Sequence, residues 1–336
     1  MTPQIKTNFT LPLNFNDDEV KKRFAKYLNL GFPRIYPKVF RLKNVRISNN
    51  SVIFRFFKIF RQSCIGEAIY KKYKNGFGFY LKFIIPKLLF RPKKIILITD
   101  EWTSNYYHWH IYSLIRLKNI FEKGFDKNFH LLLPSKYQKY TFVAPSLKKF
   151  GVDENKIFYL SKKSHIKAEE VISCAIRGNL SSEISSIRNT LRNQTEPTER
   201  IYISREKQAL RFVENESEVT KTLEEFGFTK VIAENLSYDE QLELFSRTKY
   251  IVGPHGAGLT NMIFMKDGTS VLELANDLPT YDYFKISNSL NIKYMYQFCE
   301  YGPNSKVKDP HHGSLIVCTE KLRENLTLML QNDRTK

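Results

Sequence analysis

The feature that most constrains this chain is a glycine-rich turn between two apolar stretches, Gly253-Pro254-His255-Gly256-Ala257-Gly258. Residues 248–252 are apolar and β-branched at their end, which predicts a buried strand, and residues 259–265 predict a helix. The three glycines let the backbone turn sharply and approach a ligand without a Cβ in the way. A helix beginning at such a turn offers unpaired N–H groups, and its dipole favours an anion. The stretch predicts a phosphate or diphosphate site, although a tight strand-to-helix turn without a ligand explains the glycines equally well.

Polar side chains around the turn favour a ligand. His255 can donate to a phosphate or a sugar, or bond its own turn, and Asn261 is expected in the first helical turn. Glu273 ends the next predicted strand, 271–274, where a carboxylate can accept from ribose hydroxyls or form a salt bridge. With two arginines discussed below, the expected nucleotide-binding residues are Arg205, Arg211, Gly253, His255, Gly256, Ala257, Gly258, Leu259, Asn261 and Glu273.

From residue 95 onward, short apolar strands alternate with amphipathic helices, which predicts parallel sheets. Strands are expected at 95–99, 129–133, 157–160, 200–204, 229–233, 248–252 and 271–274, and helices at 107–121, 135–150, 180–192 and 319–331. Asn215 with Glu218, and Ser237 with Glu240, predict capping boxes for two further helices.

The first 94 residues follow a different pattern. A helix is expected at 17–30, capped by Asn16 or Asp17, and a second at 64–74. Alternating residues at 39–60 predict two or three strands that turn at Asn49-Asn50.

The polar linker 194–199 predicts a domain boundary within an α/β fold. We expect a basic, β-containing amino-terminal extension at 1–94 packed on the first domain, a Rossmann-like domain at 95–196, and a second Rossmann-like domain at 197–336 with a closing carboxyl-terminal helix. The two domains are expected to face each other across a cleft, with the ligand at the carboxyl ends of the strands.

Three stretches carry a resemblance. The glycine turn continues as Leu259-Thr260-Asn261 and is followed by Val271-Leu272-Glu273-Leu274. Upstream lie Arg200-Ile201-Tyr202-Ile203-Ser204-Arg205 with Arg211, Asn215 and Glu216, and earlier still Asn105-Tyr106-Tyr107-His108-Trp109 with Arg116. In this order they resemble the motifs of glycosyltransferase family 61 over roughly residues 95 to 275. The resemblance implies an inverting transferase, and the paired domains fit its two-domain, GT-B type of architecture.

A transferase that releases a nucleotide must stabilise charge on the leaving diphosphate. Arg205 directly follows a predicted strand, and Arg211 lies six residues later, so both guanidinium groups can reach phosphate oxygens. The alternative for Arg205 is a surface salt bridge. The sequence has no DxD motif. Asp17-Asp18 is the one acidic pair that resembles a metal site, and it starts a predicted helix. We therefore expect no metal and no cofactor, with the arginines and the turn acting as Mg²⁺ does in other transferases.

The acceptor side is expected near the end of the strand at 95–99. Relatives commonly carry an acid four positions after the motif histidine and a proline before the arginine, whereas this chain has Tyr112 and Ile115. His108 is then the leading candidate for the catalytic base, and Asp100 is the second. The other expected acceptor-side residues, some of which core packing also explains, are Glu101, Asn105, Tyr107, Trp109, Tyr112 and Arg116.

Charge is concentrated in the first hundred residues, which hold 21 Lys and Arg against 5 Asp and Glu. Aromatic residues alternate with these cations at 52–61. Such a surface suits an anionic membrane, and in composition also nucleic acid or a plain solvated face. We expect the membrane as a partner and no nucleic acid. Four widely spaced cysteines, a polar amino terminus and no bilayer-length apolar run predict a cytoplasmic protein, peripheral on the inner membrane face.

The sequence as a whole predicts a glycosyltransferase that moves a sugar from a nucleotide sugar to a hydroxyl of a glycan or lipid-linked glycan in bacterial surface polysaccharide synthesis. The alternative is a degenerate, non-catalytic relative that binds membrane or nucleic acid through its basic face. Release of nucleoside diphosphate in the presence of an acceptor separates the two.

Overall fold

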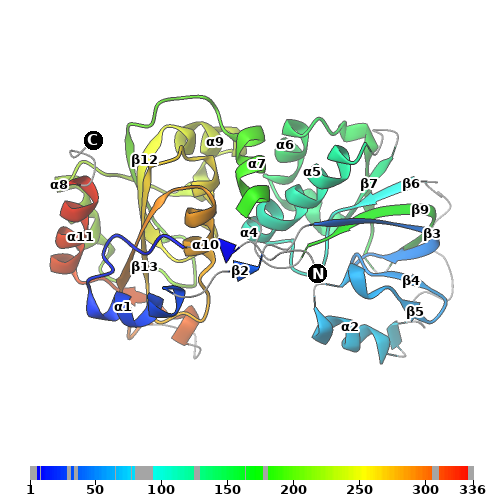
Figure 1. The fold of residues 1–336 in the computed structure, drawn as a ribbon, viewed down its shortest axis with the longest axis horizontal. Coiled ribbons are helices and arrows are strands. Elements are labelled where there is room, and N and C mark those ends of the chain that lie inside the picture. The colour runs from blue at the N-terminus through cyan, green and yellow to red at the C-terminus, as the bar shows by residue number, and fades with distance from the viewer. Residues whose placement is uncertain are drawn as a thin grey trace. The chain divides into compact units, whose positions relative to one another are not determined.

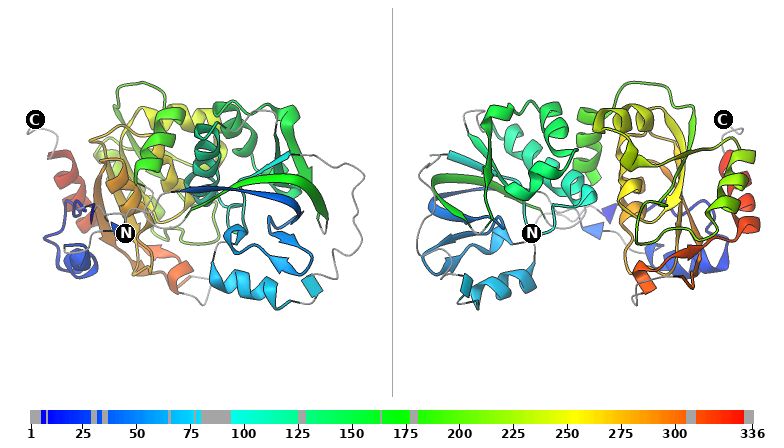
Figure 2. Two further views of the ribbon diagram at one scale, coloured as in Figure 1. Left: turned by 45° about the vertical axis from the view of Figure 1, so that its right-hand side comes forward. Right: turned by 180° about the vertical axis from the view of Figure 1, so that it is seen from behind.

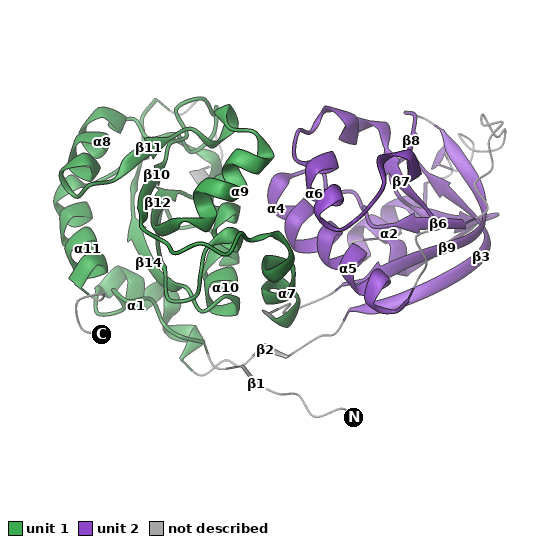
Figure 3. Ribbon diagram, turned by 90° about the horizontal axis from the view of Figure 1, so that it is seen from above, with its two compact units in different colours: residues 1–34, 179–336 green, residues 35–178 purple. Residues whose placement is uncertain are grey.

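The chain forms two compact units in a computed structural model (Figure 3). Unit 1 comprises residues 1–34 and 179–336, and unit 2 comprises residues 35–178. The structure describes residues 6–7, 9–28, 32–33, 37–64, 66–76, 78–79, 94–124, 129–162, 164–176, 181–304 and 310–331. These limits differ from the expected divisions at 94 and 196, for reasons given below.

Unit 1 is built on a five-stranded parallel sheet in the order β11-β10-β12-β13-β14. The strands are β10 (Glu199–Ile203), β11 (Thr229–Val231), β12 (Thr248–Pro254), β13 (Ser270–Ala275) and β14 (Lys293–Phe298). From β10 the chain goes to β11 on one side, and then returns to place β12 on the other side of β10. The carboxyl ends of β10 and β12 therefore meet at a topological switch point, where open parallel sheets bind ligands.

Helices cover both faces of this sheet (Figure 1). They are α7 (Ser181–Leu191), α8 (Glu216–Glu225), α9 (Tyr238–Ser246), α10 (Asp282–Ser289) and α11 (Thr319–Gln331). The predicted closing helix, α11, begins and ends as expected and packs on α8 and β14 within unit 1. Beneath it, side chains such as Leu322 and Leu326 join Val252 and Leu272 in a buried cluster.

Residues 181–191 belong to unit 1 because α7 is bonded to α10. Ser185 Oγ donates to Ser289 O at 2.7 Å, and Arg188 donates to Leu290 O at 3.0 Å. Arg188 also forms an ion pair with Asp267. The contacts of α7 explain why the compact unit begins before the linker 194–199.

The two expected capping boxes have different outcomes. Ser237 and Glu240 form the predicted box at α9. The box at α8 is wrong, because the Asn215 side chain accepts from Val317 N at 3.1 Å and donates to Val317 O at 2.9 Å. An amide can satisfy a distant backbone in this way, which local spacing does not reveal.

The amino-terminal helix α1 (Asp18–Phe24) is capped by Asp17 as predicted and continues as a 3₁₀ turn to Tyr27; its predicted end at 29–31 lies outside the described residues. Phe24 is buried and packs on Phe284 of α10, with ring centroids 4.9 Å apart. Leu13 N donates to Tyr294 O of the edge strand β14. Residues 9–28 are thus part of unit 1.

Unit 2 contains a seven-stranded mixed sheet in the order β5-β4-β3-β9-β6-β7-β8. Its strands are β3 (Lys38–Ser48), β4 (Ile53–Arg55), β5 (Lys58–Ile59), β6 (Lys94–Leu97), β7 (His130–Pro134), β8 (Ile157–Leu160) and β9 (His165–Ala175). β3 pairs antiparallel with β9 along its length, and the blue and green strands lie side by side in Figure 2. The expected strands at 39–60 therefore exist, but they extend the unit 2 sheet instead of forming a separate extension.

The remaining elements are short. In unit 2, α2 (Glu67–Lys74) and α6 (Val143–Lys149) are α-helical. The helix predicted at 107–121 is composite: α4 (Tyr106–His108), a π-helical stretch (Trp109–Leu114) and α5 (Ile115–Glu122). Two strand pairs lie outside the main sheets: β1 (Lys6–Thr7) with β2 (Phe32–Pro33), and β15 (Glu300–Tyr301) with β16 (Leu315–Ile316). In the described ranges, no helix combines the length and apolarity needed to cross a membrane.

Candidate functional site

Two arginines gather at the switch point of the unit 1 sheet. Arg205 follows β10 and is 9% exposed, and its Nε and Nη2 donate to Leu210 O at 3.2 and 3.0 Å. Burial, and then the nearby Arg211, lower the pKa of Arg205 to about 10, so it stays charged at neutral pH. Burial also lowers the pKa of Arg211.

Neither arginine has a counter-ion. No carboxylate in the described part of the chain lies within 4.0 Å of Arg205 or Arg211, and Arg211 Nε is buried without a hydrogen-bond acceptor. Arg211 also has a φ of +54°, a conformation uncommon for a large side chain and found where other contacts hold it. Buried cations are ordinarily paired, so buried Arg205, with partly buried Arg211 beside it, indicates a site for an anion from outside the chain.

The glycine turn packs closely against Arg205. A Cβ on Gly256 would lie 2.0 Å from Arg205 Nη1, so glycine is needed for this arrangement. The other two glycines serve packing: a Cβ at Gly258 or Gly253 would meet Ile203 of β10 at 3.0 or 3.3 Å. The close backbone approach predicted for Gly253 and Gly258 is therefore an approach to β10.

The helix expected after the turn is a 3₁₀ helix, Ala257–Phe264. Two predicted ligand residues in it point into the fold. Leu259 is 1% exposed, and Asn261 is fully buried, where its Nδ2 donates to Gln241 Oε1 of α9 at 3.2 Å. Their expected contact with a nucleotide is corrected to a role in holding the turn on the sheet. Ala257 remains partly exposed at the start of the helix.

Glu273 orients His255. The Glu273 carboxylate is 4% exposed, with Oε1 hydrogen-bonded to His255 Nδ1 and Oε2 accepting from Tyr294 OH at 2.5 Å. These bonds replace the ribose contact expected for Glu273. They leave His255 Nε2 as the ring nitrogen for a ligand, and the His255 ring also contacts Tyr283 edge-on, with centroids 5.0 Å apart. Tyr283 OH donates to Gly256 O, which fixes the turn beside the arginines.

A cavity of about 1060 Å³ opens at the same carboxyl edge, at the ends of β13 and β14. Arg23 of α1 forms part of its wall, between the rings of Tyr281 and Tyr296, and pairs with Asp277 at 2.9 Å. The cavity has the size of pockets that hold nucleotides or saccharides.

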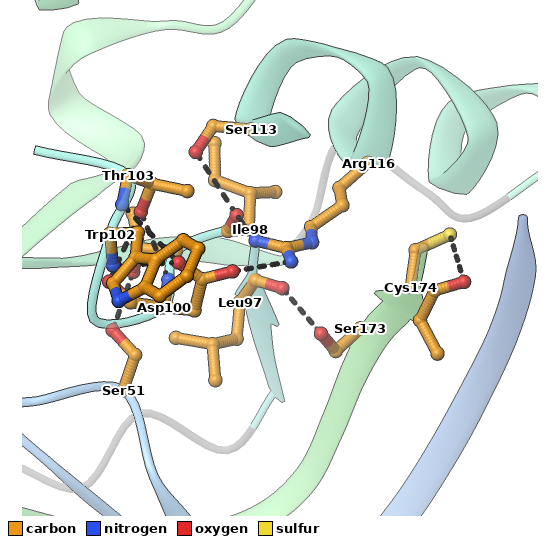
Figure 4. A network of polar contacts seen from close by, with 12 residues as sticks. Ser51, Leu97, Ile98, Asp100, Trp102, Thr103, Ser113, Arg116, Ser173 and Cys174 are labelled. Carbon is orange, nitrogen blue, oxygen red and sulfur yellow. Dashed lines mark hydrogen bonds and ion pairs between the residues drawn. The ribbon is translucent and has the colours of Figure 1, made fainter. Parts of the chain in front are cut away.

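On unit 2, Asp100 and Arg116 form a buried ion pair (Figure 4). Arg116 Nη2 lies 2.5 Å from Asp100 Oδ2, and Arg116 Nη1 donates to Ile98 O at 2.9 Å. The other Asp100 oxygen accepts from Trp102 N and Thr103 N. With both oxygens bonded and 3% exposure, Asp100 shapes the turn after β6 and is not placed to accept a proton from an acceptor. The expected base role of Asp100 and acceptor role of Arg116 are corrected to structural ones.

The motif aromatics also divide into buried and accessible groups. Trp109 is fully buried and its Nε1 donates to Ser146 Oγ at 2.9 Å, so its expected acceptor role is corrected to core packing. Asn105 caps α4 by accepting from Tyr107 N. Half-buried His108 stacks on Tyr112 with centroids 5.5 Å apart, as expected for residues one helical turn apart.

The accessible group on unit 2 comprises His108, Tyr107, Tyr112 and Trp102. The Tyr107 and Trp102 rings lie 5.1 and 5.7 Å from His108, and Trp102 is 54% exposed. Glu101, partly buried, precedes Trp102 in the same turn. The structure thus brings His108 together with aromatic rings of the kind that stack on sugars.

A comparison with protein-family models finds a match that spans residues of both units. A model described as Glycosyltransferase 61 matches residues 106–272. The chain belongs to glycosyltransferase family 61. No curated protein matches it. The family 61 match begins at α4 on unit 2 and ends in β13 on unit 1, so it includes His108, Arg205 and the glycine turn, and it stops one residue before Glu273.

Sequence reasoning missed three residues around these sites of the family 61 chain. Tyr283 and Tyr294 lie on α10 and β14, which were not predicted, and they fix the turn and Glu273. Trp102 was overlooked beside its acidic neighbours. The short apolar, aromatic run at 294–298 was a usable signal for β14.

Proposed function

We propose that this family 61 glycosyltransferase moves a sugar from a nucleotide-sugar donor to a hydroxyl of a glycan or lipid-linked glycan, with inversion at the anomeric carbon. The observation that supports this most is the pair of arginines at the switch point, buried Arg205 and partly buried Arg211, neither of which has an ion-pair partner within 4.0 Å among the described residues. A diphosphate supplies the missing negative charge, and guanidinium groups match its oxygens bidentately.

In this proposal, the acceptor oxygen attacks the anomeric carbon while the bond from that carbon to the diphosphate oxygen breaks. Arg205, Arg211 and the first N–H groups of the 3₁₀ helix stabilise the charge on the diphosphate as it leaves. His255, held through Nδ1 by Glu273, donates from Nε2 to the diphosphate when protonated. The cavity beside Asp277 has room for the sugar part of a substrate.

The acceptor proton passes to a base on unit 2, for which His108 is our candidate. His108 lies among rings that can stack on a saccharide, whereas both oxygens of Asp100 are already bonded. A GT-B arrangement, with unit 1 binding the donor and unit 2 the acceptor across a cleft, is part of this proposal.

No metal and no cofactor are required in the proposed reaction, since the arginines supply the positive charge. We expect EDTA at about 10 mM to leave turnover unchanged. Activity that disappears with EDTA and returns with Mn²⁺ refutes the metal-independent reaction. The proposed setting is bacterial surface polysaccharide synthesis, capsule or lipopolysaccharide, by a cytoplasmic protein peripheral on the inner membrane face.

The test is release of nucleoside diphosphate from a panel of nucleotide sugars, with and without candidate glycan acceptors. We expect acceptor-dependent release that falls by about two orders of magnitude in Arg205→Ala. Arg247→Ala is the matched control, because Arg247 also lies on unit 1, follows α9 and has a 45% exposed side chain. Equal activity in Arg205→Ala and Arg247→Ala contradicts the proposed site.

A further inference from the structure

A hairpin at the edge of the unit 2 sheet carries two exposed phenylalanines at its tip. β4 and β5 pair through Arg55 and Lys58, which leaves Phe56 and Phe57 as a two-residue turn. Phe56 is 84% exposed and Phe57 is 76% exposed, more than any other large hydrophobic residue of the described chain. Nothing in the proposed reaction uses them.

The turn itself does not favour phenylalanine. Phe56 has a φ of +49°, and two-residue hairpin turns of this kind favour Gly, Asn or Asp, because a large side chain is strained at positive φ. The chain thus keeps a large apolar residue where local folding disfavours it and where it is not buried. A function outside the fold accounts for both features.

The base of the hairpin is firmly attached. Ile53, Phe54 and Ile59 are 0%, 2% and 5% exposed, and they pack into the unit 2 core. Arg55 Nε donates to Asn44 O on β3 at 3.1 Å. The exposed tip is therefore held in a fixed position by a buried base.

Cations lie beside the tip. A groove of about 480 Å³ beside Phe56 is lined by Lys43, Asn44, Arg46, Arg55, Phe56 and Lys167, with no carboxylate among them. Lys58 follows the turn directly. The nearby Glu170 is paired with Arg41 at 2.8 Å, so it does not neutralise this group. Two apolar rings beside these cations match the interface of an anionic bilayer, with acyl chains beneath phosphate groups.

We propose that the β4–β5 hairpin docks this protein on an anionic membrane, with Phe56 and Phe57 entering the acyl boundary and the cations contacting lipid phosphates. A nucleic acid duplex has its bases stacked inside and offers no apolar layer to two adjacent rings. Single strands, whose bases can stack on aromatic rings, are the alternative that the test below separates. A lipid-linked acceptor would bring the reaction to the same surface. The docking itself requires neither donor nor acceptor, so its failure is distinguishable from failure of the proposed transfer.

The test uses the full chain and sedimenting vesicles of phosphatidylcholine, with or without phosphatidylglycerol. Phe56→Gly/Phe57→Asn replaces the tip with a Gly-Asn turn, which places glycine at the one turn residue with a positive φ, so the variant keeps or gains thermal stability. We expect its partition onto anionic vesicles to fall at least about tenfold, because two apolar rings no longer leave water. Leu28→Asn, at an exposed apolar residue on unit 1, is the matched control and should bind as the parent does.

Insertion has its own readout. The fluorescence of Phe57→Trp should shift to the blue with anionic vesicles and be quenched by brominated acyl chains, and added salt should weaken binding. Unchanged partition of the Gly-Asn variant, absence of the shift and quenching, or no preference for anionic over neutral vesicles overturns the proposal. Tighter binding of the parent to single-stranded DNA than to vesicles, at one ionic strength, also overturns it in favour of nucleic acid.

Discussion

Replacing Gly256 by alanine should displace the Arg205 guanidinium although Arg205 itself is not substituted. The new Cβ would lie 2.0 Å from Arg205 Nη1, whereas such contacts are essentially never below 3.0 Å, so the guanidinium must move by at least 1.0 Å. A displacement of about 1 Å in a catalytic group can cost about 100-fold in rate. We therefore expect nucleoside diphosphate release by Gly256→Ala to fall by about two orders of magnitude.

The fold should tolerate this change. Gly256 has φ 160° and ψ 173°, an extended conformation that alanine also adopts, and the clashing atoms belong to the far end of a long side chain. The unfolding temperature should stay within about 3 °C of the parent, which corresponds to about 1 kcal/mol for a unit of this size.

A double-mutant cycle with Arg205→Ala isolates the mechanism. If Gly256→Ala acts through Arg205, it should add little to Arg205→Ala, with a coupling energy close to the whole single-mutant effect. Steady-state release kinetics of the four proteins give this coupling. Additive losses, or a Gly256→Ala protein as active as the parent, would refute the assignment of Arg205 to the diphosphate.

Three further predictions concern unit 2. Asp100→Asn should destabilise the fold by about 3–5 kcal/mol in urea titrations, because it leaves Arg116 as a buried, unpaired charge, and an unchanged midpoint would refute the structural role of Asp100. His108→Ala should abolish transfer and spare nucleoside diphosphate binding. The rate of the parent should fall at acidic pH, because a protonated imidazole accepts no proton. Full transfer by His108→Ala would show that another residue is the base. Burial lowers the pKa of His110 to about 4, below its ordinary value of about 6.5, so the unfolded state takes up the proton first as pH falls. Stability should therefore decrease from about pH 6.5 to pH 4 by about 3 kcal/mol, and His110→Asn should flatten that slope; an identical slope in the variant counts against a buried neutral His110.

Sequence patterns predicted the elements whose signals are local. The strand, turn and helix around Gly256, the capping box at Ser237 and the ends of α11 follow from periodicity and capping, which neighbouring residues determine. By contrast β9, α10 and β14 were not predicted. β9 has an irregular alternation, and its place between β3 and β6 depends on pairing with distant strands.

Sequence patterns also indicated where the candidate site lies, but not which motif residues face it. Arg205 and Asn261 are both buried and both belong to motifs, yet Asn261 has a protein partner and Arg205 has no counter-ion. His108 and Trp109 also belong to one motif, yet Trp109 is fully buried with its indole bonded to Ser146, whereas His108 is half-buried beside the exposed Trp102. Whether a buried polar group is already satisfied depends on tertiary contacts, which spacing in the sequence does not contain.

Calorimetric titration with nucleoside diphosphates tests the central claim most directly, namely that the carboxyl edge of the unit 1 sheet binds a diphosphate through Arg205 and Arg211. We predict that at least one of the uridine, guanosine, cytidine, adenosine or thymidine diphosphates binds the purified chain. Arg205→Ala and Arg211→Ala should each weaken that binding by at least about tenfold, as expected for loss of a charge-assisted hydrogen bond, while Arg247→Ala leaves it unchanged. Binding that survives both substitutions, or no binding of any of the five, would contradict the account.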